Sequence, residues 1–164
     1  MSPNLALISI PAYYLLSLAP HMYALNVRTQ GQPSQLDNAN PRSTSNQEEI
    51  SSRLSSEELA RYERAEAAHK NNFENLPLYI GAVFAGLLAE QATKGTIGKT
   101  YVSSGVSTGL TRFVYGWFAL RGLYNVAYIA TTDQKVSYLR SGLYFATVGL
   151  AFEQFWNAAQ ILGY

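Results

Sequence analysis

The chain contains no cysteine, so disulfide bonds, thiolate metal sites and cysteine nucleophiles are all excluded. Charged residues are also scarce, at 14% of the chain, whereas roughly 25% is typical of soluble domains. The formal net charge is only +1. Nucleic acid is therefore disfavoured as a partner, because binding to phosphates needs a concentrated basic face.

The few charged residues are concentrated in one part of the chain. Residues 1–27 contain none, residues 28–74 contain 14, and residues 75–164 contain nine. A mean hydropathy of −0.06 resembles that of a soluble protein, but it averages over strongly different segments. This distribution is typical of a membrane protein with one polar loop. The length of 164 residues predicts a single transmembrane domain over residues 1–164.

An uncharged segment near the start predicts the first membrane-spanning helix, over residues 5–26. Its first 21 residues carry no charge, and about 20 apolar residues are needed to cross the hydrocarbon core. A cleavable signal peptide is the alternative, but there is no basic segment before it, and the apolar part exceeds the usual length of roughly 7–15 residues. We therefore expect this segment to span the membrane, bent at Pro11 and Pro20.

Three further helices follow a polar loop over residues 28–56, which is rich in Ser, Asn, Gln and Pro and predicts little core of its own. The predicted helices cover residues 57–92, 101–131 and 136–162, with the first of them starting in water and continuing unbroken into lipid. Ser55 or Ser56 can cap this helix, and Pro77 can kink it. The fold class is therefore an all-α integral membrane four-helix bundle. Because Arg is concentrated over residues 28–64, the positive-inside rule places that region in the cytosol.

Polar side chains on the second predicted helix form a first group of candidate site residues. Ionisable residues within membrane helices are costly, so each is a functional candidate. Arg64, Asn71 and Glu74 are seven and three residues apart and therefore share a face of the helix. His69 points elsewhere on this spacing.

The third and fourth helices supply matching groups. Arg121, Tyr124 and Tyr128 form one stripe at i, i+3 and i+7, and Arg140 lies in the first turns of the fourth helix. All these groups lie near the cytosolic ends of their helices, so they predict a shared pocket. Arginines can hold the carboxylates of an anionic ligand, and an arginine or a tyrosine hydroxyl can stabilise a thiolate or an oxyanion.

Structural interpretations of these residues remain open. Tyr124 and Tyr128 can be interfacial anchors, and Asn71 and Glu74 can make an interhelical hydrogen bond. No metal site is predicted, because His69 and Glu74 are five residues apart; we also expect His21 to be isolated on the first helix. A second polar group deeper in the bilayer is interpreted as structural, with mutual neutralisation of its members, Glu90, Arg112 and Glu153.

Three stretches of sequence resemble the MAPEG family, the membrane-associated proteins in eicosanoid and glutathione metabolism. They are "ERAEAAHKNNFENLP", "RGLYNVAYI" and "LRSGLY". The stretch "NANPRS" just upstream resembles the fungal branch of this family. The resemblance covers nearly the whole chain. It implies a homotrimer in the endoplasmic reticulum membrane, with glutathione as the cofactor bound between subunits near the cytosolic face.

The resemblance also implies roles for individual residues. Those that match glutathione-binding positions are Arg28, His69, Asn71, Glu74, Arg121, Tyr124 and Tyr128, and Arg64 is added to the binding residues as a substitute. Those that match catalytic positions are Arg140, which would stabilise the thiolate, and Tyr128. The chain departs from the family at Ala67, where well-studied members carry an arginine; Arg64, one turn away on the same face, is the candidate substitute.

The implied function is a glutathione transferase or peroxidase that acts on a lipophilic electrophile. Two alternatives remain open at this point. The same pocket can serve a glutathione-independent isomerase or cyclase of a lipophilic metabolite, because Ala67 replaces the usual arginine. The second alternative is a non-catalytic accessory protein that binds lipid, since the family includes such a member.

Overall fold

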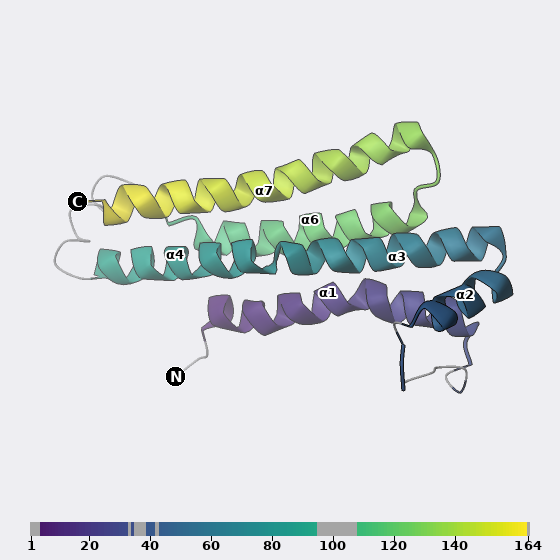
Figure 1. The fold of residues 1–164 in the computed structure, drawn as a ribbon. Helices are drawn as coiled ribbons and strands as arrows, with labels where there is room; N and C mark the ends of the chain where they lie inside the picture. Colours follow the sequence, from purple (N-terminus) through teal and green to yellow (C-terminus); the bar gives the residue numbers. More distant parts are fainter. Residues whose placement is uncertain (1–3, 33, 35–38, 42, 95–107, 164) are drawn as a thin grey trace.

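The computed structural model describes residues 4–32, 34, 39–41, 43–94 and 108–163. Within these ranges the chain is all helical and has no strand. The helices are α1 (Leu5–Thr29), α2 (Thr44–Arg53), α3 (Ser56–Glu74), α4 (Leu76–Lys94), α6 (Leu110–Ala130) and α7 (Gln134–Leu162). In Figure 1, α3 and α4 follow one another in one long rod, and α1, α6 and α7 run alongside it. The predicted all-α class is confirmed.

The predicted unbroken helix over residues 57–92 is wrong at one position, because α3 ends at Glu74 and α4 begins at Leu76. Pro77 causes the break, since it has no backbone N–H to donate to the carbonyl one turn earlier. Asn75 forms the junction, and its side-chain amide donates to the Asn71 carbonyl at 2.8 Å. At its other end α3 starts as predicted, with Ser55 and Glu58 forming a reciprocal capping box.

The first helix and the polar loop also differ from the prediction. The helix runs three residues beyond the predicted end at residue 26, to Thr29. The segment predicted as a loop over residues 28–56 contains α2, which is capped by Ser43 through a hydrogen bond from the Asn46 N–H. This helix forms because Ile50 and the following Leu54 are buried, at 3% and 6% exposure. Two apolar residues one turn apart are enough to dock a short helix that is otherwise polar.

The two C-terminal helices start at different residues from those predicted. Residues 101–107 lie outside the described residues, but the predicted helix over 101–131 is wrong at its described start, since α6 begins at Leu110. Gly109 precedes it with a φ of 65°, a left-handed conformation that glycine adopts without strain. Helix α7 begins two residues earlier than predicted, because the Asp133 side chain accepts a hydrogen bond from the Lys135 N–H at 2.6 Å.

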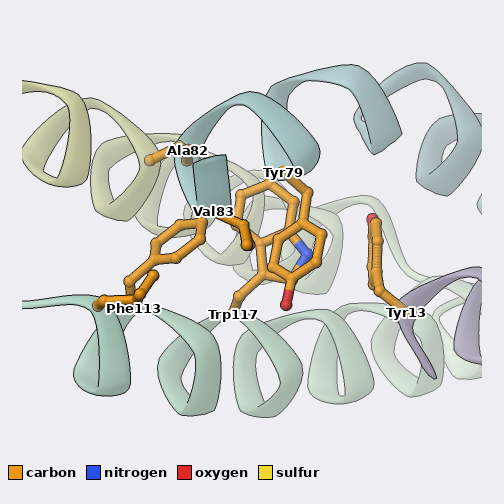
Figure 2. Packing of buried hydrophobic residues seen from close by; sticks show 8 residues of the cluster. Tyr13, Tyr79, Ala82, Val83, Phe113 and Trp117 are labelled. Atoms are coloured by element: carbon orange, nitrogen blue, oxygen red, sulfur yellow. The ribbon is translucent and has the colours of Figure 1, made fainter. Parts of the chain in front are cut away.

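An aromatic cluster holds α1, α4 and α6 together. Figure 2 shows the rings of Tyr13, Tyr79, Phe113 and Trp117 gathered between these helices. Tyr13 and Tyr79 lie 4.8 Å apart between ring centres, and Tyr79 and Trp117 lie 5.0 Å apart. The buried hydroxyl of Tyr79 is satisfied by Ser9 Oγ at 2.5 Å. This cluster fixes the rotation of α6, and therefore the direction in which its polar stripe points.

The arrangement brings one end each of α1, α3, α6 and α7 to the same end of the molecule. The C-terminal ends of α1 and α6 lie at the same end of the molecule as the N-terminal ends of α3 and α7 (Figure 1). Two stretches, Leu5–Thr29 and Ser56–Thr93, are long and apolar enough to cross a membrane. These apolar helices indicate association with a membrane. The crossing of the bilayer by α6 and α7 stays a prediction.

Candidate functional site

Arg121 of α6 is the centre of the predicted site. Its side chain is completely buried, at 0% exposure. The guanidinium Nη1 donates a hydrogen bond to Asn71 Oδ1 of α3 at 2.8 Å. Its Nε and Nη2 atoms have no hydrogen-bond partner within the described residues. No carboxylate among the described residues forms an ion pair with Arg121. The site therefore contains a buried cation with two unused nitrogen donors.

Aromatic rings surround this guanidinium. Its central carbon lies 5.2 Å from the ring centre of Trp117, 5.2 Å from that of Tyr124 and 5.6 Å from that of Tyr144. Ring faces attract cations but do not neutralise them. The arrangement therefore holds the charge in place without giving Nε and Nη2 a hydrogen-bond acceptor among the described residues.

Arg140 of α7 joins the same group through Tyr128. The Arg140 guanidinium lies 4.1 Å from the ring centre of Tyr128, and the Tyr124 and Tyr128 rings are in edge contact at 5.5 Å. Arg121, Tyr124 and Tyr128 thus form the single stripe that their spacing predicts. Arg140 is partly exposed, so its guanidinium remains accessible to a ligand.

Arg64 also faces α6, as Asn71 does. Its Nε donates to the Ile129 carbonyl at 3.0 Å. Ile129 directly follows Tyr128, so the side chain reaches the end of the polar stripe on α6. Glu74 is exposed and has no hydrogen bond or ion pair within the described part of the chain. The structure therefore brings together Arg64, Asn71, Arg121, Tyr124, Tyr128 and Arg140, and leaves Glu74 at the surface.

Two predicted binding residues lie apart from this group in the single chain. Arg28 is buried, and its Nη2 donates to Asn46 Oδ1 at 2.7 Å, which fixes α2 against α1. His69 faces α1, where its Nδ1 donates to the Ser17 carbonyl at 2.8 Å. Neither contacts Arg121 or Asn71 among the described interactions.

The expectation that His21 is isolated is wrong. Its Nδ1 bonds to Glu66 Oε1 of α3 at 2.7 Å, and its ring stacks on that of His69 with centres 4.9 Å apart. His21 and Ser17 are one turn apart on α1, and Glu66 and His69 are one turn apart on the antiparallel α3. The two Nδ1 atoms consequently point in opposite directions along the helices. This arrangement joins α1 to α3 and does not converge on a common ligand.

Several polar residues near the site were not predicted. Asn72 Nδ2 donates to Asn125 Oδ1 at 2.8 Å, in a fully buried contact between α3 and α6. Tyr144 packs against Arg121 from α7. Asn125 is four residues after Arg121, and Tyr144 is four residues after Arg140. Residues four positions apart share a helix face, so the i+4 positions of Arg121 and Arg140 would have identified Asn125 and Tyr144.

The second polar group, at the opposite end of the molecule, is confirmed in part. Arg112 of α6 forms an ion pair with Glu153 of α7. Glu90 is not part of this pair, and instead accepts a hydrogen bond from Thr108 Oγ1 at 3.4 Å. Within the described residues, two of the three charged groups, Arg112 and Glu153, therefore neutralise each other, and Glu90 does not take part.

Comparison with known proteins agrees with these observations. No curated protein and no solved structure matches the chain significantly. A model of the MAPEG family matches residues 5–159, which is nearly the entire chain and includes every residue of the group around Arg121. The chain therefore belongs to the MAPEG family.

Proposed function

We propose that this protein is a glutathione-dependent membrane enzyme, and that the buried cation Arg121 binds a carboxylate of glutathione. The observation that carries the proposal is the pair of unused donors on Arg121, at Nε and Nη2. Leaving a buried charged group without partners costs several kcal/mol, about 3–5 in the strongest cases. A carboxylate accepting from both nitrogens would remove that cost through a bidentate, charge-assisted pair.

Asn71 is the second binding group in this proposal. Its Oδ1 already accepts from Arg121, which orients the amide and leaves its Nδ2 as the donor to the ligand. Glutathione carries two carboxylates, an ammonium group and two amide bonds, so it suits a site with several donors and acceptors. Glu74, exposed one turn beyond Asn71, is the candidate partner of the ammonium.

Arg64 takes the place of the arginine that other family members carry at the position of Ala67. The contact of Arg64 Nε with the Ile129 carbonyl supports this substitution, because it directs the guanidinium toward the end of α6 that holds Tyr128. Its remaining nitrogens are then available for the second carboxylate of glutathione.

Arg140 and Tyr128 are the proposed catalytic groups. Stacking on the Tyr128 ring holds the Arg140 guanidinium at 4.1 Å, where it would stabilise the thiolate of glutathione after the thiol has released its proton to water. The sulfur then attacks the electrophilic carbon of a lipophilic substrate, and a carbon–sulfur bond forms as the leaving group departs with its bonding electrons. Reduction of a lipid peroxide by the same thiolate is the related reaction.

We further propose that the enzyme is a homotrimer of four-helix protomers in the endoplasmic reticulum membrane, with its site facing the cytosol. An assembly is supported by the exposed position of Glu74 and by the contacts of Arg28 and His69, which within one chain are made to Asn46 and Ser17 and not to Arg121 or Asn71. A neighbouring subunit would supply His69, whereas Arg28 would first have to leave its buried contact with Asn46. The sequence "NANPRS" supports a fungal-type member, and the lipophilic substrate would arrive through the bilayer.

Calorimetry on detergent-solubilised protein tests the proposal. We expect glutathione to bind to the unmodified protein and Arg121→Lys to weaken binding by about tenfold or more, because lysine keeps the charge and loses the planar pair of donors. Arg112→Lys is the matched control, since Arg112 lies at the opposite end of the molecule in an exposed ion pair. Equal effects of the two substitutions would contradict the assignment of Arg121.

Two outcomes would favour the other functions. Turnover of a lipophilic substrate after rigorous removal of glutathione would support an isomerase or cyclase, for which the missing arginine at Ala67 is the favouring observation. Lipid binding without turnover of any thiol or electrophile would support an accessory protein.

A further inference from the structure

Glu90, near the end of α4, has no ion-pair partner within the described part of the chain. Arg112 is already paired with Glu153. The hydrogen bond that Glu90 accepts from Thr108 is 3.4 Å long, which is beyond the usual range for O–H···O bonds and indicates a weak contact. The side chain is nevertheless only partly exposed. With respect to the described side chains, the carboxylate near the end of α4 therefore retains most of its capacity to bind a donor.

This carboxylate lines a groove of about 570 Å³ between α1 and α6. Figure 1 shows the N-terminal ends of α1 and α6 at the same end of the molecule as the C-terminal end of α4. The walls are mainly apolar, with Leu5 and Ile8 on α1 and with Val114 and Phe118 on α6. Ligand-binding pockets are typically about 300–1,000 Å³. The groove is therefore large enough for a drug-sized molecule.

The polar groups on α1 that line the groove are already engaged. Asn4 Oδ1 accepts hydrogen bonds from two backbone N–H groups at the start of α1. Ser9 Oγ donates to the Ala6 carbonyl and accepts from the Tyr79 hydroxyl. Thr111 and Tyr115 of α6 add two hydroxyl groups to the lining, and Glu90 is the charged group among the lining residues.

We propose that this groove binds a lipophilic amine, with its apolar body between α1 and α6 and its ammonium group at Glu90. Charge complementarity selects this ligand, because a neutral acyl chain would fill the walls and leave the carboxylate unpaired. An ammonium near an apolar surface forms a much stronger pair with a carboxylate than it does in water.

This site is separate from the proposed glutathione site. Glu90 is 19 residues beyond Asn71 on the rod formed by α3 and α4, which corresponds to roughly 28 Å at about 1.5 Å per residue. The glutathione site presents buried cations to an anion, whereas the groove presents an anion to a cation. The amine proposal therefore does not rest on the proposed enzymatic function.

Binding of radiolabelled dodecylamine to the protein in lipid nanodiscs tests this proposal, with dodecanol as the neutral probe and empty nanodiscs as the background. Glu90→Gln is expected to weaken dodecylamine binding by about tenfold or more, and to change dodecanol binding less than about twofold. Glu153→Gln is the matched control, because it makes the same change of charge at the same end of the molecule. We expect it to bind both probes as the unmodified protein does.

A second variant tests the groove independently of the charge. Ile8→Trp places a larger ring in the groove and is expected to weaken the binding of both probes. Ile8 is exposed, at 46%, so this change leaves the buried core intact. The proposal is overturned if Glu90→Gln and Glu153→Gln have equal effects on dodecylamine, if amine binding does not exceed that of empty nanodiscs, or if Ile8→Trp binds both probes normally.

Discussion

Replacing Arg121 by methionine distinguishes a ligand site from a structural contact. If Arg121 is held for an anion, the unliganded protein carries two unsatisfied buried nitrogens at this position. Each such group costs about 1–3 kcal/mol, so their removal contributes roughly 2–6 kcal/mol. The lost hydrogen bond to Asn71 offsets about 1.5–3 kcal/mol of this gain, and the lost contacts with the three aromatic rings offset roughly 1 kcal/mol more. From the middle of these ranges we therefore expect Arg121→Met to make the unliganded protein more stable by about 1 kcal/mol.

The neighbouring pair Asn72–Asn125 provides the matched control. It also joins α3 to α6, and no ligand role is assigned to it. Asn72 Oδ1 already lacks a hydrogen-bond partner among the described residues, so Asn125→Leu removes the one described partner of the Asn72 amide and is expected to destabilise the protein by about 1–3 kcal/mol. The two substitutions should therefore change the stability of the unliganded protein in opposite directions.

Thermal unfolding in detergent, with and without glutathione, is the appropriate assay. A ligand at 100 times its dissociation constant stabilises a protein by about 2.7 kcal/mol, or roughly 5–11 °C at about 2–4 °C per kcal/mol. We expect this shift in the unmodified protein and in Asn125→Leu, and none in Arg121→Met. A lower melting temperature for unliganded Arg121→Met, together with a retained glutathione shift, would refute the reasoning.

Two further predictions concern turnover and packing. Arg140→Ala should lower kcat about tenfold or more while glutathione affinity changes little, because Arg140 stacks on Tyr128 and is proposed to act on the thiolate. Single-turnover kinetics measure the first quantity and calorimetry measures the second. An unchanged kcat in an active preparation would exclude this role for Arg140. Gly86→Ala should destabilise the protein by about 1–3 kcal/mol, because the added methyl group would lie 2.6 Å from Gln154 Nε2. Gly122→Ala, where the methyl group meets nothing within 4 Å, should be neutral or stabilising in the same thermal assay, and equal effects would contradict the packing argument.

The sequence was sufficient to predict contacts that depend on spacing within one helix. The stripe of Arg121, Tyr124 and Tyr128 and the shared face of Arg64 and Asn71 follow from the helical repeat alone. The capping box at the start of α3 is equally local, since Ser55 and Glu58 are three residues apart.

Contacts between helices were not predictable in this way, because they depend on how each helix is rotated about its own axis. The pairing of His21 with Glu66 joins residues 45 positions apart. The sequence does not show toward which neighbouring helix His21 or Glu66 points. It likewise does not show that Asn72 and Asn125 face one another. The break at Asn75 was missed for a different reason, since proline in a membrane helix can be accommodated as a kink or can end the helix.

A structure of the detergent-solubilised protein with glutathione would test the central claim most directly. The account predicts density for glutathione with a carboxylate within hydrogen-bond distance of Arg121 Nε and Nη2, and with Asn71 as a second contact. Glutathione bound elsewhere, with these two nitrogens still unpaired or satisfied by another part of the protein, would contradict it.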